Sequence, residues 1–153
     1  MFCHLIRHGK DDDTVRGGWS NTSLTEYGVE QVHKLGVQLQ EMDLDVDCIY
    51  TSDLQRAKET AEIIAEYLKV PIQYRPEFRE TNNGDLAGMK NEEAAERYPE
   101  MYWSSMDYNQ YYPNGESPET FYKRVEEGWE KFKEDVKITD AKNVVLVTHG
   151  GVI

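Results

Sequence analysis

Short apolar runs alternate with long amphipathic patterns along this chain, and that alternation restricts the fold more than any other feature of the sequence. Apolar runs cover residues 2–6, 47–51 and 143–148, with a shorter one at 72–74, and they have the length and composition of strands. Helical spacing of apolar residues covers 25–42, 54–68 and 118–136. The alternation predicts an α/β fold, a three-layer sandwich with a mainly parallel central sheet and helices on both faces.

Two helix starts carry capping sequences. Ser23 with Glu26 three residues later is a candidate capping box, and Thr25 is an equal candidate for the N-cap of the same helix. Ser117 before Pro118 suits an N-cap followed by proline at the first helical position. We therefore expect helices to begin within two residues of these positions.

The charge of the chain limits the partners it can have. Its 153 residues suit one domain, and 17 basic against 29 acidic residues give a formal net charge of −12. Nucleic-acid binding draws on clustered Lys and Arg, so nucleic acid is not an expected partner. An acidic surface also repels anionic metabolites, so a phosphate site would need its own local group of cations.

The N-terminus and the cysteines bear on the compartment. His4, Arg7 and His8 interrupt any signal-peptide apolar region, and the longest apolar run, 144–147, is too short to cross a bilayer. Cys3 and Cys48 lie in predicted strands, and two cysteines are too few for the disulfide framework of a small secreted domain. We expect reduced thiols, a cytoplasmic location and no membrane partner.

Two predicted strands end in a histidine followed by glycine. Arg7-His8-Gly9 follows the first strand, and Thr148-His149-Gly150-Gly151 follows the last. Ligands of parallel α/β sheets bind at the carboxyl ends of strands, so two histidines at one sheet edge could flank a single phosphoryl group. Glycine beside each histidine lets the backbone approach an oxyanion closely.

These motifs belong to a longer ordered series that resembles the histidine phosphatase superfamily, also called phosphoglycerate mutase-like. The resemblance spans essentially the whole chain and implies the phosphoglycerate mutase-like fold. The series consists of Arg7-His8-Gly9, Leu24-Thr25 with Gly28 and Gln31, Ser52 with Leu54, Arg56, Ala57, Thr60 and Ala61, then Glu80, Gly115-Glu116-Ser117 and His149-Gly150-Gly151.

The resemblance implies a phosphate-binding cluster with a nucleophile. His8 would be the nucleophile, neutral at attack, with its second ring nitrogen held by a hydrogen bond. Arg7 and Arg56 would bind phosphate oxygens through guanidinium forks whose charge does not titrate. His149, with the adjoining Gly150, would share that role. Such a cluster stabilises a transferring phosphoryl group without a metal or other cofactor.

The resemblance also implies a proton donor and further substrate contacts. Glu80, shortly after the strand at 72–74, matches the family's acid, and neighbouring Glu77 is the rival assignment. Arg16 lies in a segment similar to the family's connection from the nucleophile loop to the first helix, with Asn21 where Asp is common. We expect Arg16 and Asn21 to contact substrate.

Residues 10–14 depart from the family pattern. Where the family often has Glu-Thr or Glu-Ser, this chain has Lys10 and then three aspartates, Asp11 to Asp13. Such a charge run is typical of a solvated loop, and it lacks the spacing of a calcium loop. A zinc site built from His4 and His8 is excluded, because four residues of strand separate them by ~13 Å. No metal site is expected.

An aromatic-rich segment, residues 81–116, has weaker periodicity than the rest of the chain. Two interpretations are equally open: a lid or pocket wall, or surface packing of helix and loop. Its large aromatic residues are Tyr98, Tyr102, Trp103, Tyr108, Tyr111 and Tyr112.

The functional prediction is a phosphatase that hydrolyses a small phosphomonoester through a phosphohistidine on His8. The resemblance favours this activity over the first alternative, a phosphoglycerate mutase-type phosphoryl transfer, because the spacing from Glu80 to His149 is compact in the way of the family's phosphatase branch. The second alternative is a non-catalytic interaction or regulatory module of the same fold. The residues leave open sugar phosphates, phosphoglycerates, nucleotide-precursor phosphates and phosphoamino acids as substrates.

The resemblance also implies a further helix and a last strand after His149. With Ile153 as the last residue, we expect residues 1–153 to be a single, C-terminally truncated histidine-phosphatase domain. One face of the sheet near His149 should then be bare, with Val152 and Ile153 unsupported. A homodimer would cover that face.

Overall fold

Four parallel strands form the centre of the computed structural model, which describes residues 1–153. The strands are β1 (Phe2–Arg7), β2 (Cys48–Thr51), β3 (Ile72–Tyr74) and β4 (Asn143–Thr148). Their order across the sheet is β1-β4-β2-β3, and every neighbouring pair is parallel. The chain therefore places its last strand between the first two, which brings the ends of β1 and β4 side by side.

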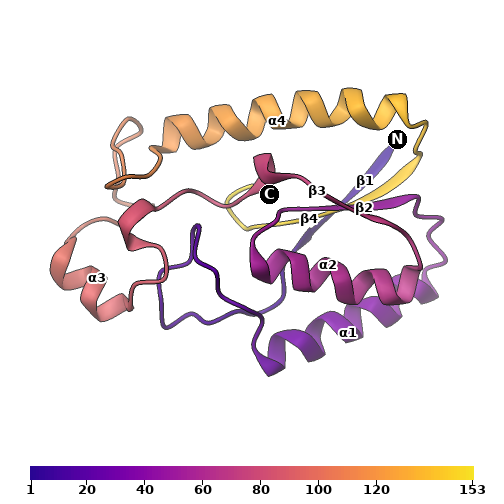
Figure 1. Cartoon of the computed structure of the whole chain (residues 1–153), viewed down its shortest axis with the longest axis horizontal. Helices are drawn as coiled ribbons and strands as arrows, with labels where there is room; N and C mark the ends of the chain where they lie inside the picture. Colours follow the sequence, from indigo (N-terminus) through magenta and orange to yellow (C-terminus); the bar gives the residue numbers. More distant parts are fainter.

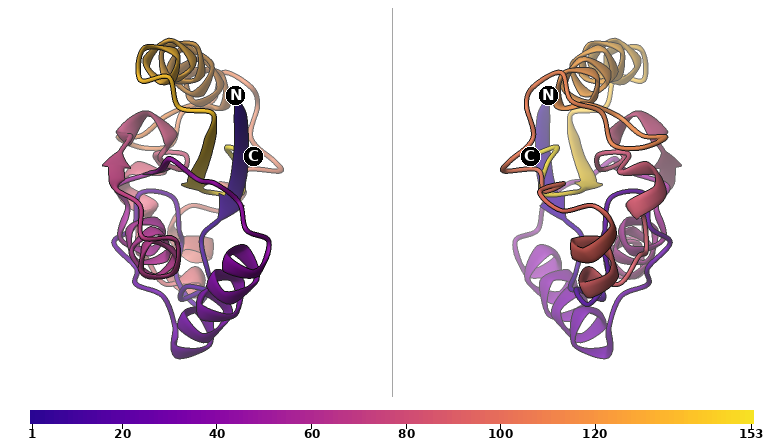
Figure 2. Two further views of the ribbon diagram at one scale, coloured as in Figure 1. Left: turned by 90° about the vertical axis from the view of Figure 1, so that its right-hand side faces the viewer. Right: turned by 90° about the vertical axis from the view of Figure 1, so that its left-hand side faces the viewer.

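Helices cover both faces of this sheet. The helices α1 (Glu26–Glu41) and α2 (Gln55–Leu68) lie on one face, and the long α4 (Pro118–Ile138) lies on the other (Figures 1 and 2). The short α3 (Asn91–Arg97) lies with the long connections beyond the end of the sheet (Figure 1). The predicted α/β sandwich with a parallel central sheet is confirmed.

The two cores follow from the alternation of side chains along β2 and β4. Ile49, Val145 and Val147 face α1 and α2, in a cluster that includes Val32 and Ile64 from those helices. Burying a side chain of this size stabilises a fold by roughly 1.5–3 kcal/mol, so the clustered apolar residues account for why these helices dock here.

The opposite face packs on aromatic rings. Tyr50 and Leu146 meet Phe132 of α4, and the ring centroids of Tyr50 and Phe132 are 4.9 Å apart in an edge-to-face arrangement. Phe78, from the turn Pro76–Phe78, completes this core. Aromatic pairs in such a geometry add about 0.5–1.5 kcal/mol beyond their burial.

The helix starts decide between the predicted caps. Thr25 is the N-cap of α1, and its hydroxyl accepts a hydrogen bond from the Gly28 amide at 3.0 Å, so the structure selects Thr25 over Ser23. Ser117 caps α4 as predicted, with Pro118 at the first helical position. The sequence leaves both caps open because serine and threonine two residues apart satisfy the same pattern.

The face of the sheet near β1 is only partly covered by α4. Leu5 is 46% exposed and lies in an apolar groove with Trp129, Val152 and Ile153. Val152 packs against the aromatic core, so the expectation that it lacks support is wrong, whereas Ile153 is exposed.

The cysteines are unpaired, and the helices are polar or short. Cys3 and Cys48 are both free thiols, and burial raises the pKa of Cys3 to about 11. None of the helices combines the length and the apolar character that a bilayer crossing requires.

Candidate active site

The two strand-end histidines lie next to each other. Arg7 at the end of β1 is in register with Thr148 at the end of β4, and the His8 amide donates to the Thr148 carbonyl at 3.0 Å. The ring centroids of His8 and His149 are 5.2 Å apart. The sheet order therefore brings together residues that are far apart in the sequence.

One ring nitrogen of His8 is held and the other faces Arg56. Nδ1 lies 2.8 Å from the Gly9 carbonyl oxygen, which can only accept, so Nδ1 carries the proton and Nε2 keeps its lone pair. Arg56 Nε donates to that Nε2 at 3.2 Å. Burial, with a further contribution from the charge of Arg56, lowers the pKa of His8 to about 4. His8 is therefore neutral at physiological pH.

Arg56, the second residue of α2, is fixed in a buried position. Its guanidinium is 2% exposed and donates to the carbonyl oxygens of Gly18 at 2.8 Å and Ser20 at 3.3 Å. The Asp11 carboxylate lies 3.4 Å from Arg56 Nε. A buried guanidinium with backbone acceptors and one carboxylate partner keeps its charge and its orientation.

Asp11 differs from its two neighbours in the aspartate run. Asp12 and Asp13 are exposed and fit the interpretation as a solvated loop, but Asp11 is half-buried against Arg56 and accepts a hydrogen bond from the Thr22 hydroxyl at 3.0 Å. For Asp11 the solvated-loop interpretation is wrong, because Asp11 forms a β-bridge with Leu24 and its side chain reaches Arg56 of α2.

His149 is fully buried. Its Nε2 lies 2.8 Å from the Ser52 hydroxyl, and its Nδ1 is buried without a hydrogen-bond partner. Burial, followed by the charge of Arg56, lowers the pKa of His149 well below its ordinary value. A hydroxyl donating to Nε2 would leave the proton on Nδ1, which could then donate to a bound oxyanion.

Glu80 and Glu77 occupy different surroundings. The Glu80 carboxylate accepts hydrogen bonds from the amides of Gly151 at 3.1 Å and Thr81 at 3.0 Å, which ties it to the segment that carries His149. Glu77 instead pairs with Arg75 at 3.5 Å and lies against α4. Of the two carboxylates, only Glu80 lines a cavity, which Gly151 also borders.

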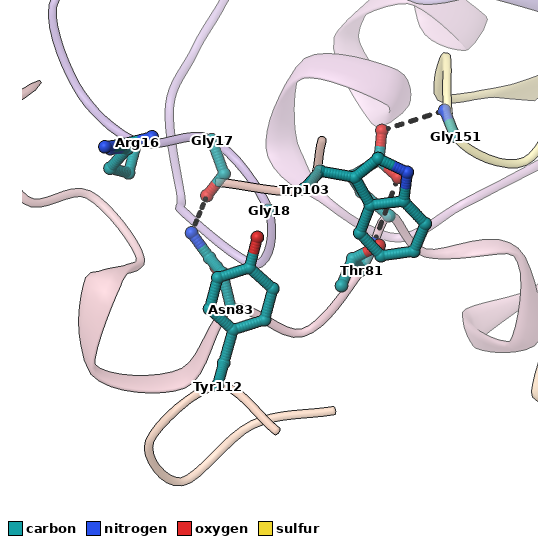
Figure 3. Close-up of a pocket in the computed structure, with 9 residues that line it drawn as sticks. Arg16, Gly17, Gly18, Thr81, Asn83, Trp103, Tyr112 and Gly151 are labelled. Carbon is teal, nitrogen blue, oxygen red and sulfur yellow. Dashed lines mark hydrogen bonds between the residues drawn. The ribbon is translucent and has the colours of Figure 1, made fainter. Parts of the chain in front are cut away.

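That cavity has a volume of about 290 Å³ and contains residues from the loop after β1 and from the aromatic-rich segment. Figure 3 shows Trp103 and Tyr112 on its walls with Arg16 and Gly151. Part of the aromatic segment is therefore a pocket wall. Another part is surface packing, since Tyr108 stacks on Tyr122 of α4 with a centroid distance of 6.2 Å.

The other predicted site residues, Arg7, Arg16 and Asn21, differ in whether they line a cavity. Arg7 is exposed beside Gly150 and lines a second cavity, of about 390 Å³, together with His8 and Asp11. Arg16 lines the first cavity. Asn21 is exposed and lines neither of these cavities, so the structure does not bring it into the cluster.

Sequence reasoning assigned no role to several residues that orient the cluster. Ser52 contacts His149, and the Trp19 indole donates to the Glu80 carbonyl at 2.7 Å. Both residues stand inside the ordered motif series or directly beside it, so their position was visible in the sequence although their contacts were not. The buried arginine, the paired histidines and the adjoining acid define a site suited to a phosphoryl group.

Comparisons with known proteins identify the family of this chain. The family model described as the histidine phosphatase superfamily (branch 1) matches residues 3–153. The chain is 35% identical over 152 residues to the uncharacterized phosphatase PhoE of Bacillus subtilis, covering 97% of this chain and 72% of that protein. It is 32% identical over 157 residues to a 2,3-bisphosphoglycerate-dependent phosphoglycerate mutase of Bartonella henselae, covering 95% and 74%.

A solved structure gives the same result. The α-ribazole phosphatase of Shigella flexneri superposes with a TM-score of 0.83 at 29% identity, over 99% of this chain and 75% of that one. The chain therefore belongs to the histidine phosphatase superfamily. The similar proteins named above are phosphatases or phosphoglycerate mutases.

Proposed function

We propose that this chain hydrolyses a small phosphomonoester through a phosphohistidine intermediate on His8. The observation that carries the proposal is the state of His8: a neutral ring whose Nδ1 is held by the Gly9 carbonyl and whose Nε2 lies 3.2 Å from Arg56 Nε. A lone pair beside a fixed cation is what an attack on phosphorus requires, because the cation binds the phosphate oxygens while the nitrogen approaches the phosphorus.

The first step would form the His8 Nε2–phosphorus bond as the ester P–O bond breaks. The departing oxygen takes a proton from the protonated Glu80 carboxyl, which leaves Glu80 as a carboxylate. For this step Arg56 must exchange its contact with Nε2 for contacts with phosphate oxygens. Arg7 and the Nδ1 of His149 supply further donors.

The second step would return the enzyme to its starting state. The Glu80 carboxylate takes a proton from water as the water oxygen attacks phosphorus, and the P–N bond breaks. The products are neutral His8, protonated Glu80 and inorganic phosphate. The hydrogen bonds from Gly151 and Thr81 support this role, because they hold the carboxylate where the histidine segment passes.

The test is the intact mass of the protein after incubation with p-nitrophenyl phosphate in the presence of EDTA, quenched at alkaline pH. We expect a phosphoryl adduct that is lost on mild acid treatment, with inorganic phosphate accumulating. His8→Ala should show neither. His33→Ala is the matched control, since His33 lies on α1 with its Nδ1 2.9 Å from the Tyr67 hydroxyl, and it should behave like the wild type.

Phosphoryl transfer to a phosphoglycerate is the second candidate, because phosphoglycerate mutases are among the similar proteins. The two activities differ in what discharges the phosphohistidine. Adduct lost faster on addition of 3-phosphoglycerate, with a bisphosphorylated product, would replace hydrolysis by transfer. A folded protein with neither adduct nor turnover would indicate a non-catalytic module.

A further inference from the structure

Arg16 lines the cavity that Glu80 also lines, and no carboxylate forms an ion pair with it. The chain has seven arginines, and five of them form ion pairs: Arg56, Arg75, Arg79, Arg97 and Arg124. Of the other two, Arg7 lies at the phosphate cluster. Arg16 is the second, although 29 acidic residues were available to pair with it.

Two donor atoms of the Arg16 side chain also lack hydrogen-bond partners. Its Nε and Nη2 atoms are buried and have no hydrogen-bond partner. A buried donor without a partner costs stability, and a charged one costs more, so such a group in a folded protein calls for an explanation. Because this guanidinium borders a cavity, a ligand group can supply the missing acceptors.

Contacts within the chain fix the position of Arg16. Its amide donates to the Met89 carbonyl at 2.8 Å, and its carbonyl accepts from the Gly88 amide at 2.8 Å. Its Cζ atom lies 4.0 Å from the centroid of the Tyr102 ring. Stacking on an aromatic face leaves the in-plane N–H groups of a guanidinium free to bind an acceptor.

The surroundings of Arg16 connect it with the reaction. It lines the same cavity as Glu80 and as Gly151 (Figure 3). Tyr112, which is almost fully buried, lines this cavity too. Glu80 lines this cavity but forms no ion pair with Arg16. The carboxylate proposed as proton donor therefore does not neutralise the Arg16 guanidinium.

We infer that Arg16 is a specificity-determining residue that binds a second anionic group of the substrate, so that the preferred substrate is a phosphomonoester that also carries a carboxylate or a second phosphate. This inference rests on the proposed phosphatase function. The phosphoryl group that is transferred occupies the cluster around His8, in the cavity that Arg7 and His8 line, and the second anion occupies the first cavity, at Arg16. Gly18 connects the two places, because it lines the Arg16 cavity and its carbonyl oxygen accepts a hydrogen bond from Arg56 Nη2 at 2.8 Å. A guanidinium fork fits both kinds of oxyanion.

Matched pairs of substrates test the inference. O-phosphoserine and O-phosphoethanolamine differ only by a carboxylate, and fructose 1,6-bisphosphate differs from fructose 6-phosphate by a second phosphate. We expect kcat/KM to favour the more anionic member of one pair by roughly 10- to 100-fold, the usual contribution of a charge-assisted hydrogen bond. The pair that shows the preference identifies the second anion.

Variants locate the preference at Arg16. Arg16→Gln should bring the ratio of kcat/KM within the pair close to one, and Arg16→Lys, which keeps the charge without the fork, should retain part of it. Arg97→Gln is the control, because Arg97 is an exposed arginine of α3 paired with Glu93. It should leave the ratio as in the wild type. General damage to the fold would lower both members of a pair equally.

The inference fails if the wild type shows no preference in either pair, or if a preference persists in Arg16→Gln. Hydrolysis of p-nitrophenyl phosphate, which has no second anion, reports separately on the proposed function. If no substrate is hydrolysed, the affinity of each substrate for the protein tests the inference instead. Titration of His8→Ala with the same pairs, followed by tryptophan fluorescence from Trp103 in the cavity wall, should still show tighter binding of the more anionic member, and equal binding would overturn the inference.

Discussion

We predict that removing the charge of Asp11 tightens phosphate binding, because Asp11 pairs with Arg56, the cation that the proposed mechanism assigns to the phosphate. Asp11 Oδ2 lies 3.4 Å from Arg56 Nε, which in turn lies 3.2 Å from His8 Nε2. A phosphate oxygen bound to Arg56 must therefore approach a carboxylate that already holds the same donor. Asp11→Asn removes the charge and keeps an oxygen that can accept from Thr22.

The magnitude follows from Coulomb's law. The two distances limit the separation of Asp11 Oδ2 and His8 Nε2 to about 7 Å, at which two like charges repel by roughly 2 kcal/mol with an effective dielectric constant of about 20. Asp11 is partly exposed, so solvent and salt reduce this to about 1 kcal/mol. The inhibition constant of inorganic phosphate should therefore fall by roughly fivefold.

Stability should move in the opposite direction. Arg56 keeps its bonds to the carbonyls of Gly18 and Ser20, so losing the carboxylate partner should cost about 1–2 kcal/mol, less than breaking a fully buried ion pair. For a chain of this length that corresponds to a fall in Tm of roughly 3–6 °C. A tighter but less stable variant is the expected combination.

The assay is competitive inhibition of p-nitrophenyl phosphate hydrolysis by inorganic phosphate, at low and at high salt, with thermal unfolding measured on the same samples. Asp12→Asn is the matched control, since it changes the net charge equally but Asp12 is exposed and bonds only to Thr14. Weaker phosphate binding by Asp11→Asn would refute the reasoning, because it would mean that Asp11 orients Arg56 for phosphate instead of competing with it.

Two further predictions concern His8 and Glu80. Because burial lowers the pKa of His8 to about 4, the nucleophile stays neutral as the pH falls, and the acid limb of kcat/KM should appear only below about pH 5; a limb centred near 6.5 would contradict the burial argument. A Cβ at Gly151 would overlap Glu80 Oε1, so Gly151→Ala should lower kcat for alkyl phosphates roughly 10- to 100-fold, and less for p-nitrophenyl phosphate, whose leaving group departs without a proton. Gly17→Ala, where a Cβ meets no atom within 4 Å, should leave the ratio of the two esters unchanged, and equal losses on both esters in Gly151→Ala would argue against Glu80 as the acid.

The fold and the placement of the two histidines could be predicted because each depends on local patterns. Strand composition and helical periodicity determined the layers, and parallel strands necessarily bring His8 and His149 to one edge of the sheet. The helix cap at Thr25 was left open because Ser23 fits the same short pattern. Patterns of this kind specify the element but leave its first residue uncertain by about two positions.

The contacts of individual polar side chains could not be predicted in the same way. Asp11 and its two exposed neighbours are the same residue type, but only Asp11 forms a β-bridge, with Leu24, and reaches Arg56. Asn21 shows the converse, since its position in the motif series placed it near substrate and the loop leaves it exposed. Side-chain direction in an irregular loop depends on long-range contacts, which no local spacing encodes.

The same loop links the electrostatic features of the site. Residues between β1 and α1 supply Asp11, which pairs with Arg56 Nε, and Arg16, whose Nε and Nη2 have no hydrogen-bond partner. The histidines, in contrast, come from the ends of two neighbouring strands of the rigid sheet. The net charge of −12 repels anions from the chain as a whole. Charges in this one loop, close to the site, should therefore have a large effect on anion binding. Substitutions there should change phosphate affinity and substrate preference separately, while the chemistry on His8 stays as it is.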